Sequence, residues 1–153
     1  EHLARALSSA ARATGASVHT GGVYLCMEGP QFSTLGESRL YRSWGVSVIG
    51  MTNLPEARLA REAELPYATL AMVTDYDCWH EGHDAVSVEA VVAVMHDNVA
   101  KAKEIIAELA QNVPDPRDRP ASSALAGAII TNPDSISEDA RKQLRPLIGK
   151  SVP

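Results

Sequence analysis

The spacing of apolar and polar residues along the chain separates predicted helices from predicted strands. Apolar residues three or four positions apart indicate four helices, over 2–14, 35–44, 56–64 and 87–112. Runs rich in apolar and β-forming residues indicate three strands, over 18–27, 46–51 and 67–73. Helices and strands therefore alternate through the first three quarters of the chain.

The predicted helices carry end signals in their sequences. Gly15 and Gly45 follow the first two helices, where glycine takes the left-handed conformation that ends a helix. Pro55 suits the first turn of the third, since the amide hydrogen that proline lacks has no partner there. Ser87 and Glu89 suit the start of the fourth, as a cap and as a negative charge near the positive helix end.

The last part of the chain has a different pattern. Segment 114–122 contains three prolines and several charges, which is typical of a linker. Beyond it, Ser135 with Glu138 predicts a capping box for a last helix that reaches Leu147. We expect the C-terminal part of an α/β domain, a Pro-rich linker and a helical tail of the same domain, over 1–112, 113–123 and 124–153.

Strands that alternate with helices across short connections predict an α/β fold, with a central sheet flanked by helices. In such sheets, ligands bind beyond the carboxyl ends of the strands. This rule selects three segments as candidate sites: 29–34, 50–53 and 74–79.

The composition excludes several classes of protein. A hydrophobic content of 45% with 22% charged residues is ordinary for a folded globular domain. The net charge of −5 offers no basic surface to nucleic acid. We expect no membrane insertion, since no apolar run reaches about 20 residues, and no secretion, since no leader opens the chain. Two cysteines, Cys26 and Cys78, form neither a disulfide framework nor a CxxC site, so we expect a cytoplasmic location.

Two carboxylates, Asp75 and Asp77, follow the third predicted strand. Acidic residues are common in loops and, taken alone, indicate only a solvated turn. Tyr76 and Trp79 flank them, however. Aromatic rings that exclude water favour the protonated form of an acid, which can then donate a proton near neutral pH. The segment is therefore a candidate acid site.

The other two strand ends offer a methionine, a threonine and a phenylalanine. Met51 and Phe32 can be ordinary core residues, and Thr52 an ordinary strand-terminal hydroxyl. In a binding site, the methionine can lie under a sugar while the threonine hydroxyl and amide donate to an anion. A purine can stack on the phenylalanine ring.

A possible metal site lies just beyond, where 80–84 holds two histidines and two acids. Helical zinc motifs space their histidines four residues apart and add a third ligand from elsewhere, whereas this segment contains glycine and continues a loop. We expect no metal here, and a metal-dependent hydrolase using His80 and His83 is a distant alternative.

The strand-end segments resemble the methylthioadenosine phosphorylase family of trimeric purine-nucleoside phosphorylases. The matching runs are 28–33, 50–56 and 74–79, with 85–88 behind them. The similarity covers about residues 1–112 and keeps the family's spacing, while the rest looks like the shorter ending of bacterial members. The resemblance implies a phosphorylase/hydrolase-like fold with a mixed central sheet, present here as a C-terminal portion.

The resemblance also implies an activity, the phosphorolysis of 5′-methylthioadenosine to adenine and 5-methylthioribose 1-phosphate in purine and methionine salvage. Inorganic phosphate is a co-substrate, no cofactor is implied, and the full-length protein is expected to be a homotrimer. Phe32 and Met51 would contact the nucleoside, and Thr52 the phosphate. Asp75 would face purine N7, and Asp77 the exocyclic amine.

Two further positions bear on substrate choice. Ser33 and Val88 match family positions that tune it, and Val91 lies one helical turn beyond Val88. Relatives that act on 6-oxopurines carry Asn in place of Asp75 and a His near Val88, suited to a 5′-hydroxyl. A methylthio group would leave that His without a partner, at about 1–3 kcal/mol. Val88 therefore favours the methylthio substrate over the alternative, a 6-oxopurine nucleoside.

The family's N-terminal half carries a Gly-Thr/Ser phosphate loop, an Arg-His pair and a Thr-Ala segment, none of which occurs in this chain. Glu1 falls within a predicted helix, so we expect the chain to begin inside a longer gene product. We expect the isolated chain to be inactive. A non-catalytic ligand-binding or interaction fragment is the alternative from another class.

Overall fold

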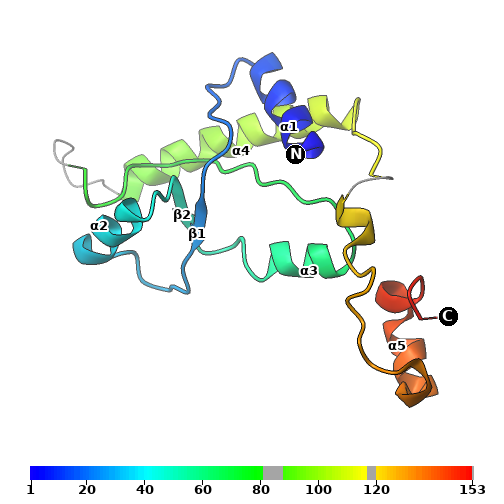
Figure 1. The fold of residues 1–153 in the computed structure, drawn as a ribbon. Helices are drawn as coiled ribbons and strands as arrows, with labels where there is room; N and C mark the ends of the chain where they lie inside the picture. Colours follow the sequence, from blue (N-terminus) through cyan, green and yellow to red (C-terminus); the bar gives the residue numbers. More distant parts are fainter. Residues whose placement is uncertain (81–87, 117–119, 153) are drawn as a thin grey trace. The chain divides into compact units, whose positions relative to one another are not determined.

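The structure, a computed structural model, describes residues 1–80, 88–116 and 120–152 (Figure 1). The elements are α1 (His2–Ala13), β1 (Tyr24–Cys26), α2 (Leu35–Ser43), β2 (Val48–Gly50), α3 (Glu56–Glu62), α4 (Val88–Ala110), two short 3-10 helices (Pro120–Ser123 and Pro133–Ser135) and α5 (Glu138–Ile148). The chain divides into two compact units, unit 1 (Glu1–Asn53 with Ala68–Pro114) and unit 2 (Leu54–Tyr67 with Asp115–Pro153). The five α-helices follow the predicted ones to within one or two residues at most ends.

Unit 1 contains the sheet of the described residues, in which β1 and β2 pair in parallel. Tyr24 lies opposite Val48, and Cys26 opposite Gly50. The pairing continues by one bond beyond the strands, where the Met27 amide donates to the Gly50 carbonyl at 2.8 Å. Parallel neighbours need a crossover connection, and α2 supplies it (Figure 1). Both strands are shorter than predicted, and their carboxyl ends lie side by side.

The prediction of a strand over 67–73 is wrong. The described residues place no strand there, and the segment is shared between the two units. Side-chain hydrogen bonds, and not strand pairing, connect residues 68–73 to the rest of unit 1. Thr69 Oγ1 donates to Asn53 Oδ1 at 2.9 Å, and Asn98 Nδ2 donates to the Val73 carbonyl at 3.0 Å. An apolar run shows which residues favour burial, but a strand also needs a neighbour with free amides and carbonyls.

The core of unit 1 lies between α1 and α4, which cross and pack against each other (Figure 1). Ala10 and Ala11 of α1 are buried against Ile105 of α4, whose exposed fraction is 1%. The two alanines let the helix axes approach closely, and a fully buried isoleucine contributes about 1.5–3 kcal/mol. Lys101 of α4 also contacts the end of α1, since its Nζ donates to the Thr14 carbonyl at 3.2 Å. None of the helices in the described ranges is long and apolar enough to cross a membrane.

A buried carboxylate, that of Glu64, connects separate parts of unit 2. Glu64 follows α3 with a left-handed backbone (φ 56°) and is only 9% exposed. Its Oε2 accepts from Lys150 Nζ at 3.0 Å, and its Oε1 accepts from the Leu125 amide at 3.2 Å. The Lys150 hydrogen bond, followed by that of the Leu125 amide, lowers the pKa of Glu64. One side chain therefore joins α3 to two separate points of the C-terminal segment.

The cap of α5 differs from the prediction. Ser137, and not Ser135, begins the helix, because its Oγ accepts from the Ala140 amide at 3.2 Å. Ser135 ends a short 3-10 helix, in which the Asn132 side chain accepts from the Asp134 amide. Asn132 and the proline that follows it provide their own turn, so the helix starts two residues later than the Ser135–Glu138 spacing indicated.

Candidate functional site

The first two predicted strand-end segments lie against each other. Gly29 has a φ of +70°, and a Cβ built on it would lie 2.7 Å from Met51 Sδ. Only glycine fits this position without displacing the methionine. The close approach of Gly29 and Met51 therefore sets how the loop after β1 lies against the residues after β2, and Met51 itself is half-buried.

The loop that carries Phe32 and Ser33 is fixed at its far end by the start of α2. Thr34 and Glu37 form a capping box: the Glu37 amide donates to Thr34 Oγ1 at 3.3 Å, and Glu37 Oε2 accepts from the Thr34 amide at 2.7 Å. The Thr34 amide, and then its hydroxyl, lower the pKa of Glu37. This cap was not among the predicted helix starts, although Thr-x-x-Glu before a helix is its known sequence signal.

The loop leaves its two candidate residues in different surroundings. Phe32 is 86% exposed, so it is not a core residue of the described chain. Ser33 is half-buried, and its Oγ lies 3.8 Å from Met27 Sδ. An exposed ring at the end of a strand is available to stack on a ligand.

The two aspartates of the third segment differ in their contacts. Asp75 is exposed, and its Oδ1 accepts from Thr74 Oγ1 at 2.6 Å. Asp77 is half-buried, and its Oδ1 accepts from the Cys78 amide at 2.9 Å. Its carbonyl also accepts from the His80 amide at 3.1 Å, which closes a turn around Asp77. The Asp77 carboxylate is therefore held by its own turn, whereas that of Asp75 faces outward.

The aromatic residues beside these acids do not cover Asp75 as predicted. Tyr76 is 62% exposed and stacks on His80, with 4.5 Å between ring centroids. Trp79 meets the edge of Tyr76 and accepts the Arg42 guanidinium over its face, with Cζ 3.4 Å from the ring centroid. Stacking and cation–π contacts favour this arrangement of the rings. The described residues consequently leave Asp75 open to solvent.

A contact joins the third segment to the first. Cys78 Sγ lies 3.5 Å from the Ser33 carbonyl, within the distance of a weak S–H hydrogen bond. Ser33 therefore lies close to the turn that begins at Asp77. Met51 lies close to the loop that carries Ser33, through its approach to Gly29. Thr52 lies next to Met51 and is exposed.

The last two candidates lie on α4. Val88 is its first residue, with a side chain outside the described part, and Val91 is half-buried one turn further on. The cap predicted at Ser87 also lies outside the described residues. The same helix carries Asn98, whose bond to the Val73 carbonyl connects α4 to the backbone just before Asp75.

The possible metal site of 80–84 lies outside the described residues except for His80. Within the described ranges, no three His, Cys, Asp or Glu side chains lie close enough to hold a metal ion.

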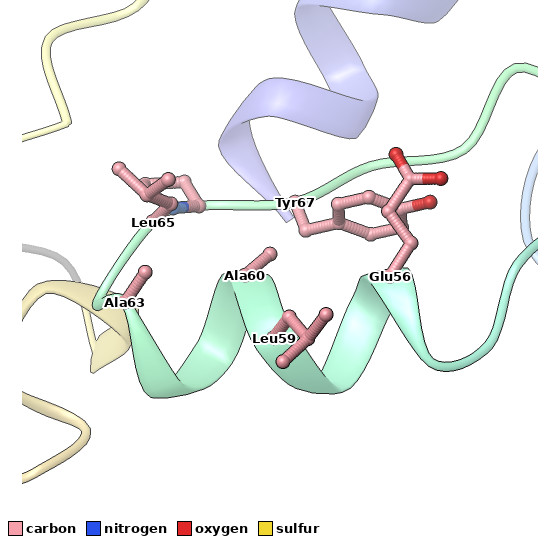
Figure 2. A pocket seen from close by; sticks show the side chains of 7 residues that line it. Glu56, Leu59, Ala60, Ala63, Leu65 and Tyr67 are labelled. Atoms are coloured by element: carbon pink, nitrogen blue, oxygen red, sulfur yellow. The ribbon is translucent and has the colours of Figure 1, made fainter.

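A shallow apolar pocket lies in unit 2, between α3 and the residues that follow it (Figure 2). Its lining residues are Glu56, Leu59, Ala60, Ala63, Leu65, Pro66 and Tyr67. Figure 2 shows the Glu56 carboxylate beside the Tyr67 ring at one end and Leu65 at the other. None of the candidate site residues lines this pocket.

Comparison with known proteins shows the family. Residues 1–111 match the sequence profile of the Phosphorylase superfamily. The chain is 54% identical over 150 residues to the S-methyl-5′-thioadenosine phosphorylase of Geobacter sulfurreducens. The aligned region covers 98% of this chain and 52% of that protein. It is 53% identical over 148 residues to the protein of the same name in Koribacter versatilis, covering 97% and 51% of the two chains.

A solved structure agrees with these matches. A methylthioadenosine phosphorylase from an Antarctic soil metagenomic library superposes with a TM-score of 0.83 at 38% identity, over 95% of this chain and 52% of that one. This likeness confirms the predicted phosphorylase-like α/β fold. The chain spans about half the length of the curated relatives it matches. Because the superfamily profile covers most of the chain and the fold agrees with it, the chain belongs to the phosphorylase superfamily.

Proposed function

We propose that a full-length protein containing this chain converts 5′-methylthioadenosine and inorganic phosphate into adenine and 5-methylthioribose 1-phosphate. The observation that carries the proposal is the match, over nearly the whole chain, to relatives named S-methyl-5′-thioadenosine phosphorylase. The local geometry supports it, since Asp77 and Ser33 belong to segments in contact, and Met51 packs on the loop that carries Ser33.

The two aspartates suit two neighbouring groups on one edge of a departing adenine, N7 and the exocyclic amine. When a phosphate oxygen attacks the anomeric carbon, the bond from that carbon to N9 breaks and its electron pair passes to the purine. Asp75 acts at N7, where it donates a proton or hydrogen bond that neutralises the leaving base, and general acids contribute about 10² to 10⁴ in rate. Asp77 accepts from the exocyclic amine through the carboxylate oxygen that the Cys78 amide does not use.

The remaining candidates bind the sugar and the phosphate. Phe32 and Met51 contact the nucleoside, and the exposed ring of Phe32 is free to stack. Thr52 donates to phosphate. Val88 and Val91 on α4 pack against the methylthio group, and Ser33 tunes the choice among substrates.

The proposal includes the other half of the protein. A stable phosphate site combines several backbone amides with Arg or Lys, and Thr52 alone supplies one or two donors. We propose that a segment like the N-terminal half of the relatives provides the rest. We further propose a homotrimer acting in the cytoplasm with no cofactor besides its co-substrate phosphate.

The test is a comparison of two nucleosides in the full-length protein. We expect kcat/KM for 5′-methylthioadenosine to exceed that for inosine by at least about tenfold, since Asp77 accepts from an amine but repels a carbonyl oxygen. Preference for inosine would instead support a 6-oxopurine nucleoside phosphorylase. Turnover of neither nucleoside would favour a binding or interaction protein.

A further inference from the structure

An arginine outside the candidate site contacts the turn that contains Asp77. The Arg42 guanidinium lies over the Trp79 ring, with Cζ 3.4 Å from its centroid. Trp79 sits inside the turn that the His80 amide closes onto the Asp77 carbonyl. Trp79 and the Asp77 carboxylate therefore belong to one closed turn, two residues apart.

The helix that carries Arg42 is anchored at the opposite end of the site. The capping box of Thr34 and Glu37 fixes where α2 begins, directly after Ser33. Arg42 lies in the last turn of the same helix, about 12 Å further along at 1.5 Å per residue. The helix α2 thus links the Phe32–Ser33 loop to Trp79. The contact from Cys78 Sγ to the Ser33 carbonyl joins the same two segments a second time.

The described contacts of the turn differ in strength and in what they join. The Asn98 bond reaches the Val73 carbonyl, which precedes Asp75. Tyr76 and His80 stack on each other within the same segment. The weak Cys78 contact and the Arg42–Trp79 stack connect the turn to another element, and the stack is the stronger of the two, since cation–π contacts are strongest with tryptophan.

We propose that Arg42 is a positioning residue that orients Asp77 for the 6-amino group of the purine by stacking on Trp79. This inference rests on the proposed function, because it assigns Asp77 to the exocyclic amine. Arg42 would then be a determinant of base specificity that lies outside the candidate site and does not touch the substrate.

The experiment measures a specificity ratio in the full-length protein. The ratio divides kcat/KM for 5′-methylthioadenosine by kcat/KM for its analogue with hydrogen in place of the 6-amino group. We expect Arg42→Ala to lower this ratio by about three- to tenfold, and Asp77→Asn by about tenfold, since small displacements at a recognition group are costly. Arg42→Lys, which keeps a cation over the ring, should restore part of the loss.

Two controls separate positioning from general damage. Arg39→Ala removes another exposed arginine of the same helix and should leave the ratio unchanged. The fluorescence contributed by Trp79, taken as the difference from Trp79→Phe, should change in Arg42→Ala and not in Arg39→Ala. If Arg42→Ala does not fold, Arg42→Met, which keeps the side-chain stem without the charge, takes its place.

The outcomes distinguish this inference from the proposed function. A wild-type protein that does not turn over 5′-methylthioadenosine refutes the function, whatever Arg42 does. A normal wild-type preference for the amino substrate that falls in Asp77→Asn but not in Arg42→Ala refutes the positioning role alone. Equal losses on both substrates in Arg42→Ala would likewise overturn it.

Discussion

Replacing Gly29 by alanine tests how the first two strand ends are joined. Alanine at a φ of +70° costs about 1–2 kcal/mol of folding free energy, because its Cβ crowds the following carbonyl. The new Cβ would also lie 2.7 Å from Met51 Sδ, well inside van der Waals contact. Since methionine is flexible, we expect it to move aside for about 1 kcal/mol more, the low end of the cost of overpacking.

Gly45 supplies the matched control. Its φ of +77° is nearly the same, but a Cβ there meets nothing within 4 Å. Urea denaturation of the two variants of the full-length protein should therefore place Gly29→Ala about 1 kcal/mol below Gly45→Ala. Because Met51 is displaced only in Gly29→Ala, KM for 5′-methylthioadenosine should rise in that variant alone. Equal stabilities and equal KM values would show that the Gly29–Met51 contact does not shape the site.

Three further predictions concern single residues. Asp75→Asn should lower turnover of 5′-methylthioadenosine at least about tenfold, because an amide cannot supply the proton of a carboxylic acid; unchanged kcat/KM would remove Asp75 from the mechanism. Val88→His should shift the preference from 5′-methylthioadenosine toward adenosine by roughly 10- to 200-fold, and an unmoved ratio would place Val88 outside the pocket. The lowered pKa of Glu64 means that its Lys150 contact stabilises the fold above the ordinary pKa of 4.5 and is lost as pH falls through the lowered value. Glu64→Gln should therefore flatten the acid limb of the stability profile while the exposed Glu62→Gln does not, and identical profiles for the two would contradict this.

Local patterns in the sequence predicted the helices well. The apolar spacing over 2–14 and 35–44 reflects contacts within a few turns, and α1 and α2 follow it closely. The strand at 67–73 failed because pairing depends on a partner far away in sequence. The prediction of the α5 cap failed because Ser135 and Ser137 both lie near Glu138. Only the geometry of the Asn132 turn decides which serine caps the helix.

The sequence proposed residues for the candidate site but not how they are arranged. The strand-end rule and the family resemblance selected Phe32, Met51 and the Asp75–Asp77 pair. No pattern in the sequence indicated that Arg42 stacks on Trp79, because that contact joins residues from two distant segments. The expectation that Trp79 covers Asp75 failed for the same reason, because Trp79 packs on Arg42 instead.

The most direct test of phosphorolysis is the identity of the sugar product. The full-length protein is incubated with 5′-methylthioadenosine, with and without inorganic phosphate, and followed by phosphorus NMR together with adenine release. We predict that adenine appears only with phosphate, and that one equivalent of 5-methylthioribose 1-phosphate accompanies each adenine. Adenine released at the same rate without phosphate, with free 5-methylthioribose as the other product, would show hydrolysis and contradict the proposed function.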